Sequence, residues 1–402
     1  MKTVIEKLPD DKARAEKILS LKICEPAMGS AAFLNEAVNQ LAVLYMDYAQ
    51  KAANERLSQE RYASELQRVK MYMADNCVFG VDLNPVAVEL AEVSLWLNAL
   101  SSDRFVPWFN LQLKSGNSLV GCRRRVYTKE DVASGNWTSV EPLDIGSKPL
   151  RGNHIWQFLL PDPGMAAYDD KDVKAIYKSK LDTLAKKRRA FVSKRFNSDD
   201  ISEMLSLSDK AEILWESLSK KLAKLRSDTT DPYDIYGHAA DRNHKVLSYE
   251  EKNALVATVM RGDGTAGSGE ALRLRLAMDY WCALWFWPID KADLFPSREE
   301  FLFDMGNILT SEVLGTNEAS YAEGLWAETK EAAQEDVYGR VSIDKLVVPG
   351  TALAVACDVA KRYRFFHWPV EFADIFLPAR EKDKKNAGFD LTFGNPPWRV
   401  PT

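Results

Sequence analysis

Apolar and polar positions along the first 121 residues predict strands that are separated by helices. Three apolar runs have the length of a strand, and each ends in residues that favour a turn. Apolar residues recur at helical spacing between these runs, and Pro85 stands in the first turn of a predicted helix, where it is tolerated. The predicted strands cover residues 21–24, 78–81 and 111–114, and the predicted helices cover residues 31–48, 54–74 and 84–100. This order predicts an α/β fold in which helices cover a parallel sheet.

The pattern changes after this region. Residues 168–226 are dense in Lys, Glu, Asp and Leu, which predicts a long helical hairpin, and an aromatic helix is expected over residues 271–287. Between them, residues 228–269 contain Asp-Pro and Gly-rich turn signals and are expected to form a loop. The strand pattern returns at Phe389–Phe393, and a turn over residues 394–398 follows it.

The interval between the third and the fourth predicted strand is far longer than one helix needs. We therefore predict a mainly helical insertion over residues 122–386. Residues 1–121 and 387–402 are expected to belong to one α/β domain that the insertion interrupts.

Composition and charge narrow the class of protein. Hydrophobic residues make up 46% and charged residues 28% of the 402 residues, which is typical of a soluble globular protein. The five cysteines follow no disulfide or zinc spacing and there are only four histidines, so we expect no metal site and a reducing, cytoplasmic location. No signal peptide opens the chain, and the longest apolar run, near residues 280–287, is too short to span a membrane. The net charge of -5 argues against non-specific coating of nucleic acid, but a local basic cleft remains compatible with a DNA enzyme.

The segment Asn395-Pro396-Pro397-Trp398 directly follows the fourth predicted strand and carries the clearest chemistry. An exocyclic amine of a nucleobase is a poor nucleophile because its lone pair is delocalised into the ring. The Asn395 side-chain oxygen and the Pro396 carbonyl can draw its N–H bonds toward a tetrahedral arrangement and free that lone pair. Two prolines keep the loop rigid, and Trp398 offers a flat face on which a flipped base can stack. The alternative is a rigid turn with a buried tryptophan, and the strand context together with three further motifs favours catalysis.

Those three motifs stand at the ends of the other predicted strands. The turn Glu25–Ser30 contains small residues that let a ligand approach the backbone, beside the free N–H groups of a helix N-terminus. Asp82 ends the second strand, where a carboxylate can bind both ribose hydroxyls, and Asn117 follows the third strand, where its amide can bind an adenine edge. Alone, each has a plain structural explanation, such as a helix cap for Asp82. In order, at consecutive strand ends, they predict one nucleoside pocket formed by Glu25, Pro26, Ala27, Gly29, Ser30, Asp82 and Asn117.

These motifs resemble those of the large adenine DNA methyltransferases of type IIG restriction-modification systems and of the BREX and DISARM phage-defence systems. Glu25-Pro-Ala-Met-Gly-Ser-Ala-Ala-Phe-Leu34 is similar to the first motif of that family, usually Asp-Pro-Ala-Cys-Gly-Ser-Gly-Ala-Phe-Leu. Gly80–Pro85 and Gly116–Leu119 resemble the second and third motifs, and Gly388–Trp398 resembles the catalytic segment. The chain departs from the first motif at Glu25, Met28 and Ala31, where aspartate, cysteine and glycine are usual.

The resemblance implies a class I S-adenosylmethionine-dependent methyltransferase, with a Rossmann-like sheet, that methylates adenine at N6. S-adenosyl-L-methionine would be the cofactor, with Glu25–Ser30 at its methionine end, Asp82 at its ribose and Asn117 at its adenine. Asn395, Pro396, Pro397 and Trp398 would form the catalytic loop. The partner would be double-stranded DNA with a flipped adenine, and no metal is required because the methyl group already carries its leaving group.

Four further points complete the sequence-based expectations. Phe366–Phe372 is similar to a run often seen ahead of the catalytic loop of the family, and we interpret His367 and Trp368 as packing residues. Four predicted strands are fewer than the roughly seven of a complete sheet, so the resemblance implies an incomplete domain at the N-terminal end of a longer protein. The role of the insertion is open between clamping DNA, contacting a defence-system protein and bracing the fold. The rival functions are methylation of an RNA or protein amino group and a degenerate, non-enzymatic scaffold in a defence complex.

Overall fold

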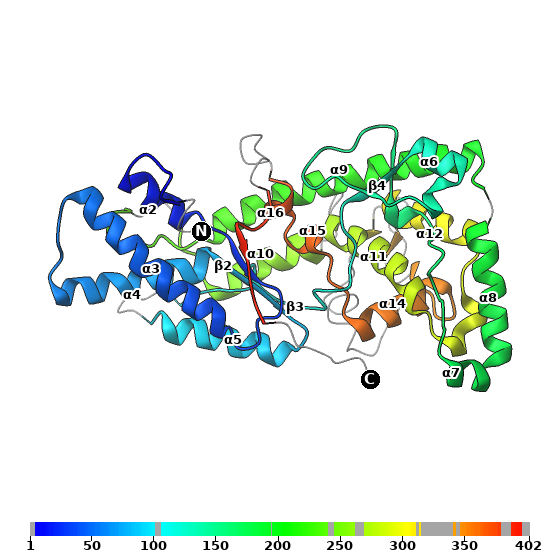
Figure 1. Ribbon diagram of the computed structural model, residues 1–402, viewed down its shortest axis with the longest axis horizontal. Helices are drawn as coiled ribbons and strands as arrows, with labels where there is room; N and C mark the ends of the chain where they lie inside the picture. Colours follow the sequence, from blue (N-terminus) through cyan, green and yellow to red (C-terminus); the bar gives the residue numbers. More distant parts are fainter. Residues whose placement is uncertain are drawn as a thin grey trace. The chain divides into compact units, whose positions relative to one another are not determined.

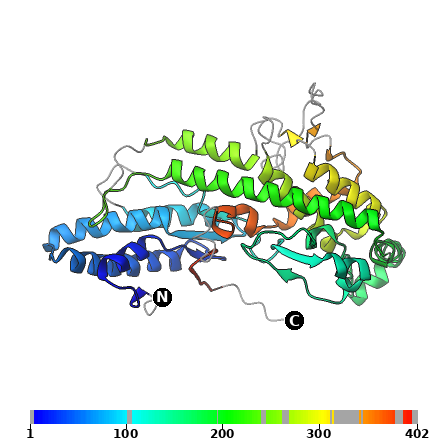
Figure 2. The same cartoon turned by 90° about the horizontal axis from the view of Figure 1, so that it is seen from above.

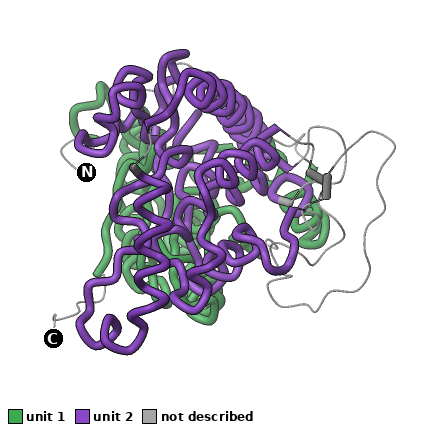
Figure 3. Tube along the Cα trace, turned by 90° about the vertical axis from the view of Figure 1, so that its right-hand side faces the viewer, with its two compact units in different colours: residues 1–118, 224–256, 388–402 green, residues 119–223, 257–387 purple. Residues whose placement is uncertain are grey.

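The computed structural model (Figures 1 and 2) describes residues 5–100, 106–193, 195–239, 245–261, 269–310, 313–314, 341–342, 346–378 and 387–395. The chain divides into two compact units, which Figure 3 shows in different colours. Unit 1 comprises Met1–Ser118, Lys224–Val256 and Gly388–Thr402, and unit 2 comprises Leu119–Ala223 and Ala257–Ala387. Unit 1 thus contains both predicted parts of the α/β domain and a stretch from within the predicted insertion. None of the described helices is long and apolar enough to cross a membrane.

Unit 1 is built on a four-stranded parallel sheet in the order β3-β2-β1-β9. The strands are β1 (Ile23–Glu25), β2 (Val78–Asp82), β3 (Leu113–Ser115) and β9 (Leu391–Thr392). In the register, Glu25 lies opposite Gly80, and Cys24 lies opposite Thr392. The prediction that the first and last segments of the chain share one parallel sheet is confirmed, although β9 is shorter than the predicted strand.

Asp390 fixes β9 beside β1. Its carboxylate accepts from the Lys17 ammonium (2.8 Å) and from the Lys22 backbone N–H (2.9 Å). The Phe393 N–H continues the ladder by donating to the Cys24 carbonyl (3.2 Å). These bonds explain how a short strand, more than 300 residues from β1 in sequence, pairs with it in a single register.

The helices of unit 1 begin where the sequence supplies caps. They are α2 (Asp11–Leu19), α3 (Ala32–Ala53), α4 (Gln59–Asn76) and α5 (Pro85–Asn98). Asp10 caps α2, Ser58 caps α4, and Asn84 caps α5 ahead of Pro85 at its first position. α3 and β1 contribute fully buried side chains, among them Ile23, Leu34 and Val38, to the main apolar core of this unit.

The stretch Lys224–Val256 packs onto α3 and α4. The Tyr45 hydroxyl donates to the Tyr236 carbonyl (2.7 Å), and the Tyr72 and Tyr233 rings meet edge to face at 6.1 Å. The prediction of a loop over residues 228–269 is wrong in part, because α10 (Tyr249–Arg261) lies within it. A capping box starts this helix: the Glu251 N–H donates to the Ser248 hydroxyl (3.1 Å), and the Ser248 N–H donates to the Glu251 carboxylate (2.8 Å).

Helices dominate unit 2. The longer ones are α8 (Lys178–Ser193), α9 (Ser198–Thr229, which ends in unit 1), α11 (Glu270–Ala283), α12 (Arg298–Thr310) and α14 (Ala352–Tyr363). The shorter ones are α6 (Lys129–Ser134), α7 (Lys171–Ile176), α15 (Trp368–Glu371), α16 (Ala373–Phe376), and the 3-10 turns η1 (Asn136–Thr138), η2 (Gln157–Leu159), η3 (Leu284–Phe286) and η4 (Ile289–Leu294). Helices therefore fill the predicted 168–226 region, and the predicted aromatic helix is α11 continued by η3.

Unit 2 also contains strands that the sequence analysis did not predict. An antiparallel sheet has the order β5-β4-β6, from β4 (Arg125–Thr128), β5 (Leu143–Asp144) and β6 (His154–Trp156). A parallel pair joins β7 (Val313–Leu314) to β8 (Val341–Ser342). Between α9 and the antiparallel sheet, the Arg124 guanidinium lies 4.8 Å from the ring centres of both Trp156 and Trp215 and bonds the Glu212 carboxylate (2.9 Å). These contacts with the rings and the carboxylate explain how the charged Arg124 side chain can be buried in the core.

Candidate cofactor and catalytic site

The carboxyl ends of the four strands of unit 1 bring the predicted motifs to one edge of the sheet. The turn over residues 26–31 follows β1, Asp82 ends β2, and residues 116–118 follow β3. The Met28 N–H donates to the Val81 carbonyl (3.1 Å), and the Gly116 N–H donates to the Asp82 carbonyl (2.9 Å). The turns after β1 and β3 are thus both bound to the end of β2, and Asn117 follows directly on this edge.

Asp82 links two of these turns through its side chain. One carboxylate oxygen accepts from the Gly29 N–H (2.9 Å), and the other accepts from the Asn84 N–H (2.8 Å). The N-terminal cap of α5 is Asn84, whose side chain accepts from the Val86 N–H (3.1 Å), so the helix-cap explanation of Asp82 is not needed. Each oxygen of a carboxylate has a second lone pair, so Asp82 can still accept hydrogen bonds from ligand hydroxyl groups.

Glu25 ends β1 as a buried carboxylate. Its side chain is 2% exposed, and one of its oxygens has no hydrogen-bond partner in the described part of the chain. Burial, opposed by the Leu34 backbone N–H and reinforced by the negative charge of Asp82, raises the pKa of Glu25 to about 7. A carboxyl group with such a pKa can take up or release a proton near neutral pH. Its buried oxygen without a partner is energetically costly, so a hydrogen-bond donor at this position would be stabilising.

The turn between β1 and α3 uses two residues with left-handed backbone. Gly29 has φ +54°, and a Cβ placed there would have nothing within 4 Å, so this glycine is required by conformation and opens onto free space. Ala31 has φ 64° and ψ 31°, is fully buried, and precedes α3 without providing a side-chain cap. The cap residue therefore gives the first turn of α3 no side-chain acceptor. Glu25 accepts from the Leu34 N–H, and the other N–H groups of this turn suit an anionic group of a ligand.

Met28 occupies the floor of this turn. A Cβ at Gly80 would overlap the Met28 sulfur and lie 3.2 Å from its Cγ and 3.3 Å from Leu113 Cδ2. Gly80 is therefore required by close packing, and Met28, which is 3% exposed, fills the space beside β2.

The catalytic segment arrives at the same edge through β9. A Cβ at Gly394 would lie 3.4 Å from Glu25 Cγ and 3.6 Å from its Oε1, which places this glycine directly beside β1. Asn395 follows and is exposed. The rings of Phe33, in the first turn of α3, and Phe393 have centroids 6.4 Å apart. Pro396, Pro397 and Trp398 lie outside the described residues, so their predicted roles stay predictions.

Two residues that shape this site were given no role from the sequence. Asp390, which anchors β9, was visible only as part of the Gly388–Trp398 likeness, and Phe33 only as an apolar position of a helix. A carboxylate next to a short strand is an ordinary surface feature in sequence, and no local signal identifies its partners.

His367 belongs to unit 2 and is a buried packing residue, as the sequence suggested. Its Nδ1 accepts from the Cys122 backbone N–H (3.0 Å), which leaves the proton on Nε2 to be donated to the Asp279 carboxylate (3.0 Å). Cys122 and Cys282 lie close by with their sulfurs 3.6 Å apart, and the three residues form the one group with metal-ligand side chains in the described residues. Because the lone pair of the imidazole is already used by a backbone N–H, this arrangement is a satisfied polar core.

Comparison with known proteins gives one informative likeness. A protein of Methanocaldococcus jannaschii, provisionally named a type II restriction enzyme and methyltransferase, is 27% identical to this chain over 119 residues. The match covers 27% of this chain and 9% of the length of that relative. No protein-family profile matches the chain, and no solved structure matches it.

Proposed function

We propose that this protein is an S-adenosylmethionine-dependent DNA methyltransferase of the restriction-modification kind, and that it methylates adenine at N6. The observation that carries the proposal is the meeting of four sequence motifs at one edge of a parallel sheet, with Gly29 bonded to Asp82 and Gly394 beside Glu25. The carboxyl edge of such a sheet is where α/β proteins bind nucleotides. The name of the Methanocaldococcus jannaschii relative supports the same assignment.

The residues at this edge suit the cofactor. Asp82 would accept from the ribose hydroxyls, and the open space at Gly29 together with the N–H groups at the start of α3 that Glu25 does not bind would accommodate the methionine carboxylate. The unpartnered oxygen of Glu25 would meet the positive charge of the methionine end. When bound, S-adenosylmethionine supplies a methyl group on a positively charged sulfur, from which a neutral thioether is a good leaving group.

Asn395 would act on the target and not on the cofactor. Its side-chain oxygen, together with the Pro396 carbonyl, would accept from the adenine amine and free the nitrogen lone pair for attack on the methyl carbon. The proton of the methylated amine is then lost toward these acceptors and solvent. Asn395 is exposed at the end of β9, as a residue that receives a flipped base must be.

Cofactor binding provides the first test. Asp82→Ala should weaken S-adenosylmethionine binding by about 1.5–3 kcal/mol, the range for hydrogen bonds to a charged group. Isothermal titration calorimetry measures this directly. The matched control is Asp47→Ala, an exposed acid on α3 that pairs with Lys51 (2.7 Å) outside the site. If wild-type protein binds no cofactor at millimolar concentration, the scaffold alternative is favoured; if Asp82→Ala binds like the wild type, the ribose role of Asp82 is wrong.

Methyl transfer provides the second test. Asn395→Ala should abolish tritium transfer from labelled cofactor to unmethylated DNA while cofactor affinity stays within about twofold, a difference of less than about 0.5 kcal/mol. The same assay offers RNA and protein as acceptors, and transfer to either in place of DNA would reassign the substrate. Wild-type turnover by Asn395→Ala would contradict the mechanism itself.

A further inference from the structure

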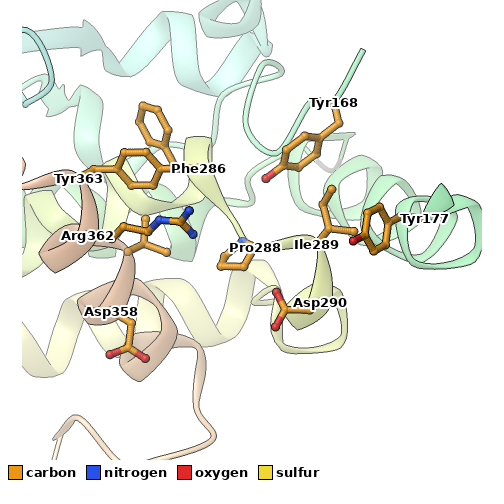
Figure 4. Close-up of a pocket in the computed structure, with 10 residues that line it drawn as sticks. Tyr168, Tyr177, Phe286, Pro288, Ile289, Asp290, Asp358, Arg362 and Tyr363 are labelled. Atoms are coloured by element: carbon orange, nitrogen blue, oxygen red, sulfur yellow. The ribbon is translucent and has the colours of Figure 1, made fainter. Parts of the chain in front are cut away.

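Unit 2 contains a surface pocket of about 470 Å³ that takes no part in the site described above. This volume falls within the range of about 300–1,000 Å³ that is typical of small-molecule sites. Aromatic side chains form much of its lining, namely Tyr168, Tyr177, Phe286 and Tyr363 (Figure 4). They come from the segment around α7, from η3 and from the end of α14, so the pocket is formed by segments that are distant in sequence.

One wall is a cluster of packed aromatic rings. The Phe286 and Tyr363 ring centres are 4.7 Å apart with an angle of 34° between the ring planes. Phe365 packs against both: it lies nearly parallel to Tyr363, at 7° and 6.2 Å, and its ring centre is 5.6 Å from that of Phe286. Such a cluster holds its rings in place before a ligand arrives, which lowers the entropic cost of binding a flat ring.

Tyrosines stand across the pocket from this wall in Figure 4. The Tyr168 hydroxyl donates to the Trp287 carbonyl, which fixes the position of its ring. Tyr177 is 46% exposed and lies at the rim beside α8. A ligand in the pocket would therefore have aromatic rings on two sides.

The polar groups of the pocket supply both donors and acceptors. The Arg362 guanidinium extends toward the space between the aromatic groups in Figure 4, with its Cζ 5.7 Å from the Tyr363 ring centre. Asp290, in η4, and Asp358, one turn before Arg362 in α14, contribute carboxylates to the lining. The formal charge of these three groups sums to about −1, since one guanidinium faces two carboxylates. A polyphosphate is disfavoured by this balance, whereas a neutral ring with both acceptors and N–H donors is favoured.

We propose that this pocket binds a nucleobase, and that guanine is the base it matches best. Guanine presents the acceptors O6 and N7, which Arg binds well, and on its other edge carries N–H donors for a carboxylate. Stacking of a base on aromatic side chains supplies the non-polar part of the binding. The base arrives either as a free nucleotide or within single-stranded nucleic acid. The proposal does not depend on the methyltransferase assignment, because no residue of the pocket belongs to unit 1.

Two probes distinguish the sources of the base. Guanosine monophosphate is titrated by calorimetry, and a fluorescein-labelled single-stranded DNA 12-mer containing guanine is followed by fluorescence anisotropy. We expect guanine-containing probes to bind at least five times more tightly than otherwise identical adenine-containing ones. Binding of the monophosphate alone assigns a free nucleotide, and binding of the oligonucleotide alone assigns a nucleic acid strand.

Substitutions of pocket residues test whether the probes bind in this pocket. Tyr363→Ala and Tyr177→Ala should each weaken the observed binding about tenfold, the equivalent of about 1.4 kcal/mol, as expected for the loss of one stacking surface. Tyr177 is exposed enough that its replacement leaves the core intact, and Tyr363→Trp should retain binding because it keeps a flat ring. The matched control is Tyr249→Ala, a tyrosine in α10 that is 56% exposed and outside the pocket. Any of three results would overturn the proposal. They are equal binding by the pocket variants and the control, no binding of either probe at millimolar concentration, and tighter binding of tetramethylammonium than of the nucleotide.

Discussion

Replacement of Glu25 by glutamine should make the folded protein more stable at neutral and alkaline pH. The glutamine keeps the shape of the side chain and an acceptor for the Leu34 N–H, but it removes the charge that burial penalises. Burial, offset by the Leu34 N–H and reinforced by Asp82, raises the pKa of Glu25 from 4.5 to about 7. At 1.36 kcal/mol per pKa unit the full difference corresponds to about 3.4 kcal/mol, and we expect about 2 kcal/mol after solvent screening and local relaxation.

The sign of the pH dependence follows from proton binding. Between pH 4.5 and about 7 the folded state keeps the Glu25 proton that the unfolded chain has lost, so stability falls as pH rises through this window. The stability of Glu25→Gln relative to the wild type should therefore be nearly constant below pH 4.5. Its relative stability should increase up to about pH 7 and level off above it.

Urea denaturation at several pH values measures this difference. The wild-type profile alone is not sufficient, because burial and the neighbouring charge of Asp231 also raise the pKa of Asp75 to about 7. That contribution is common to both proteins and cancels when the variant is compared with the wild type at each pH. A difference that does not change between pH 4 and pH 8 would refute the reasoning, since it would mean that Glu25 titrates alike in the folded and unfolded states.

Two further predictions concern the same unit and use the same denaturation assay. Ala31→Gly should raise stability by up to about 1 kcal/mol, because relief of a left-handed alanine (about 1–2 kcal/mol) exceeds the added chain entropy of glycine (about 0.5–1 kcal/mol); lower stability would show that loss of the buried methyl group dominates. Lys252→Met should lower stability by about 3–5 kcal/mol, because its ammonium pairs with Asp231 at 2.8 Å with both side chains 4% exposed, and the carboxylates of Asp231 and Asp75 would be left buried without it. A loss below about 1 kcal/mol would show that the Lys252 ammonium does not stabilise these buried carboxylates.

The sequence predicted the parallel sheet of unit 1 because strand, turn and helix signals there are local. Asn84 and Pro85 mark the start of α5, and the alternation of apolar runs with helical segments defines β1 to β3. The membership of β9 in this sheet was also predicted, from the likeness of motifs, but its pairing with β1 was not. Its physical basis, the bonds of Asp390 to Lys17 and to the Lys22 backbone, depends on contacts that no local pattern encodes.

Each structural feature that was not predicted from the sequence has a physical reason. The loop predicted over residues 228–269 left out α10. The capping-box sequence of this helix, Ser248-Tyr-Glu-Glu251, is a weaker signal than the Gly-rich turn signals that follow it. The small sheet of unit 2 was missed because its strands, two to four residues long, are not followed by turns with recognisable motifs such as those that marked the equally short β1 and β3. The grouping of Cys122, Cys282 and His367 could not be foreseen, because residues more than 80 positions apart are brought together only by tertiary packing.

The candidate site concentrates unfavourable features within a few residues of each other. Glu25 is a buried carboxylate with an unpartnered oxygen, and Ala31, six residues later, holds a left-handed conformation at a position where glycine would be unstrained. Both lie on the turn whose Gly29 is bonded to Asp82 and opens onto free space. Proteins tolerate such costs where a ligand offsets them, and a cationic group beside Glu25 would do so, since it would supply the missing donor and favour the ionised acid. A scaffold that binds nothing at this edge would be more stable without the charge at residue 25, so the presence of an acid here favours a ligand-binding site over a purely structural turn.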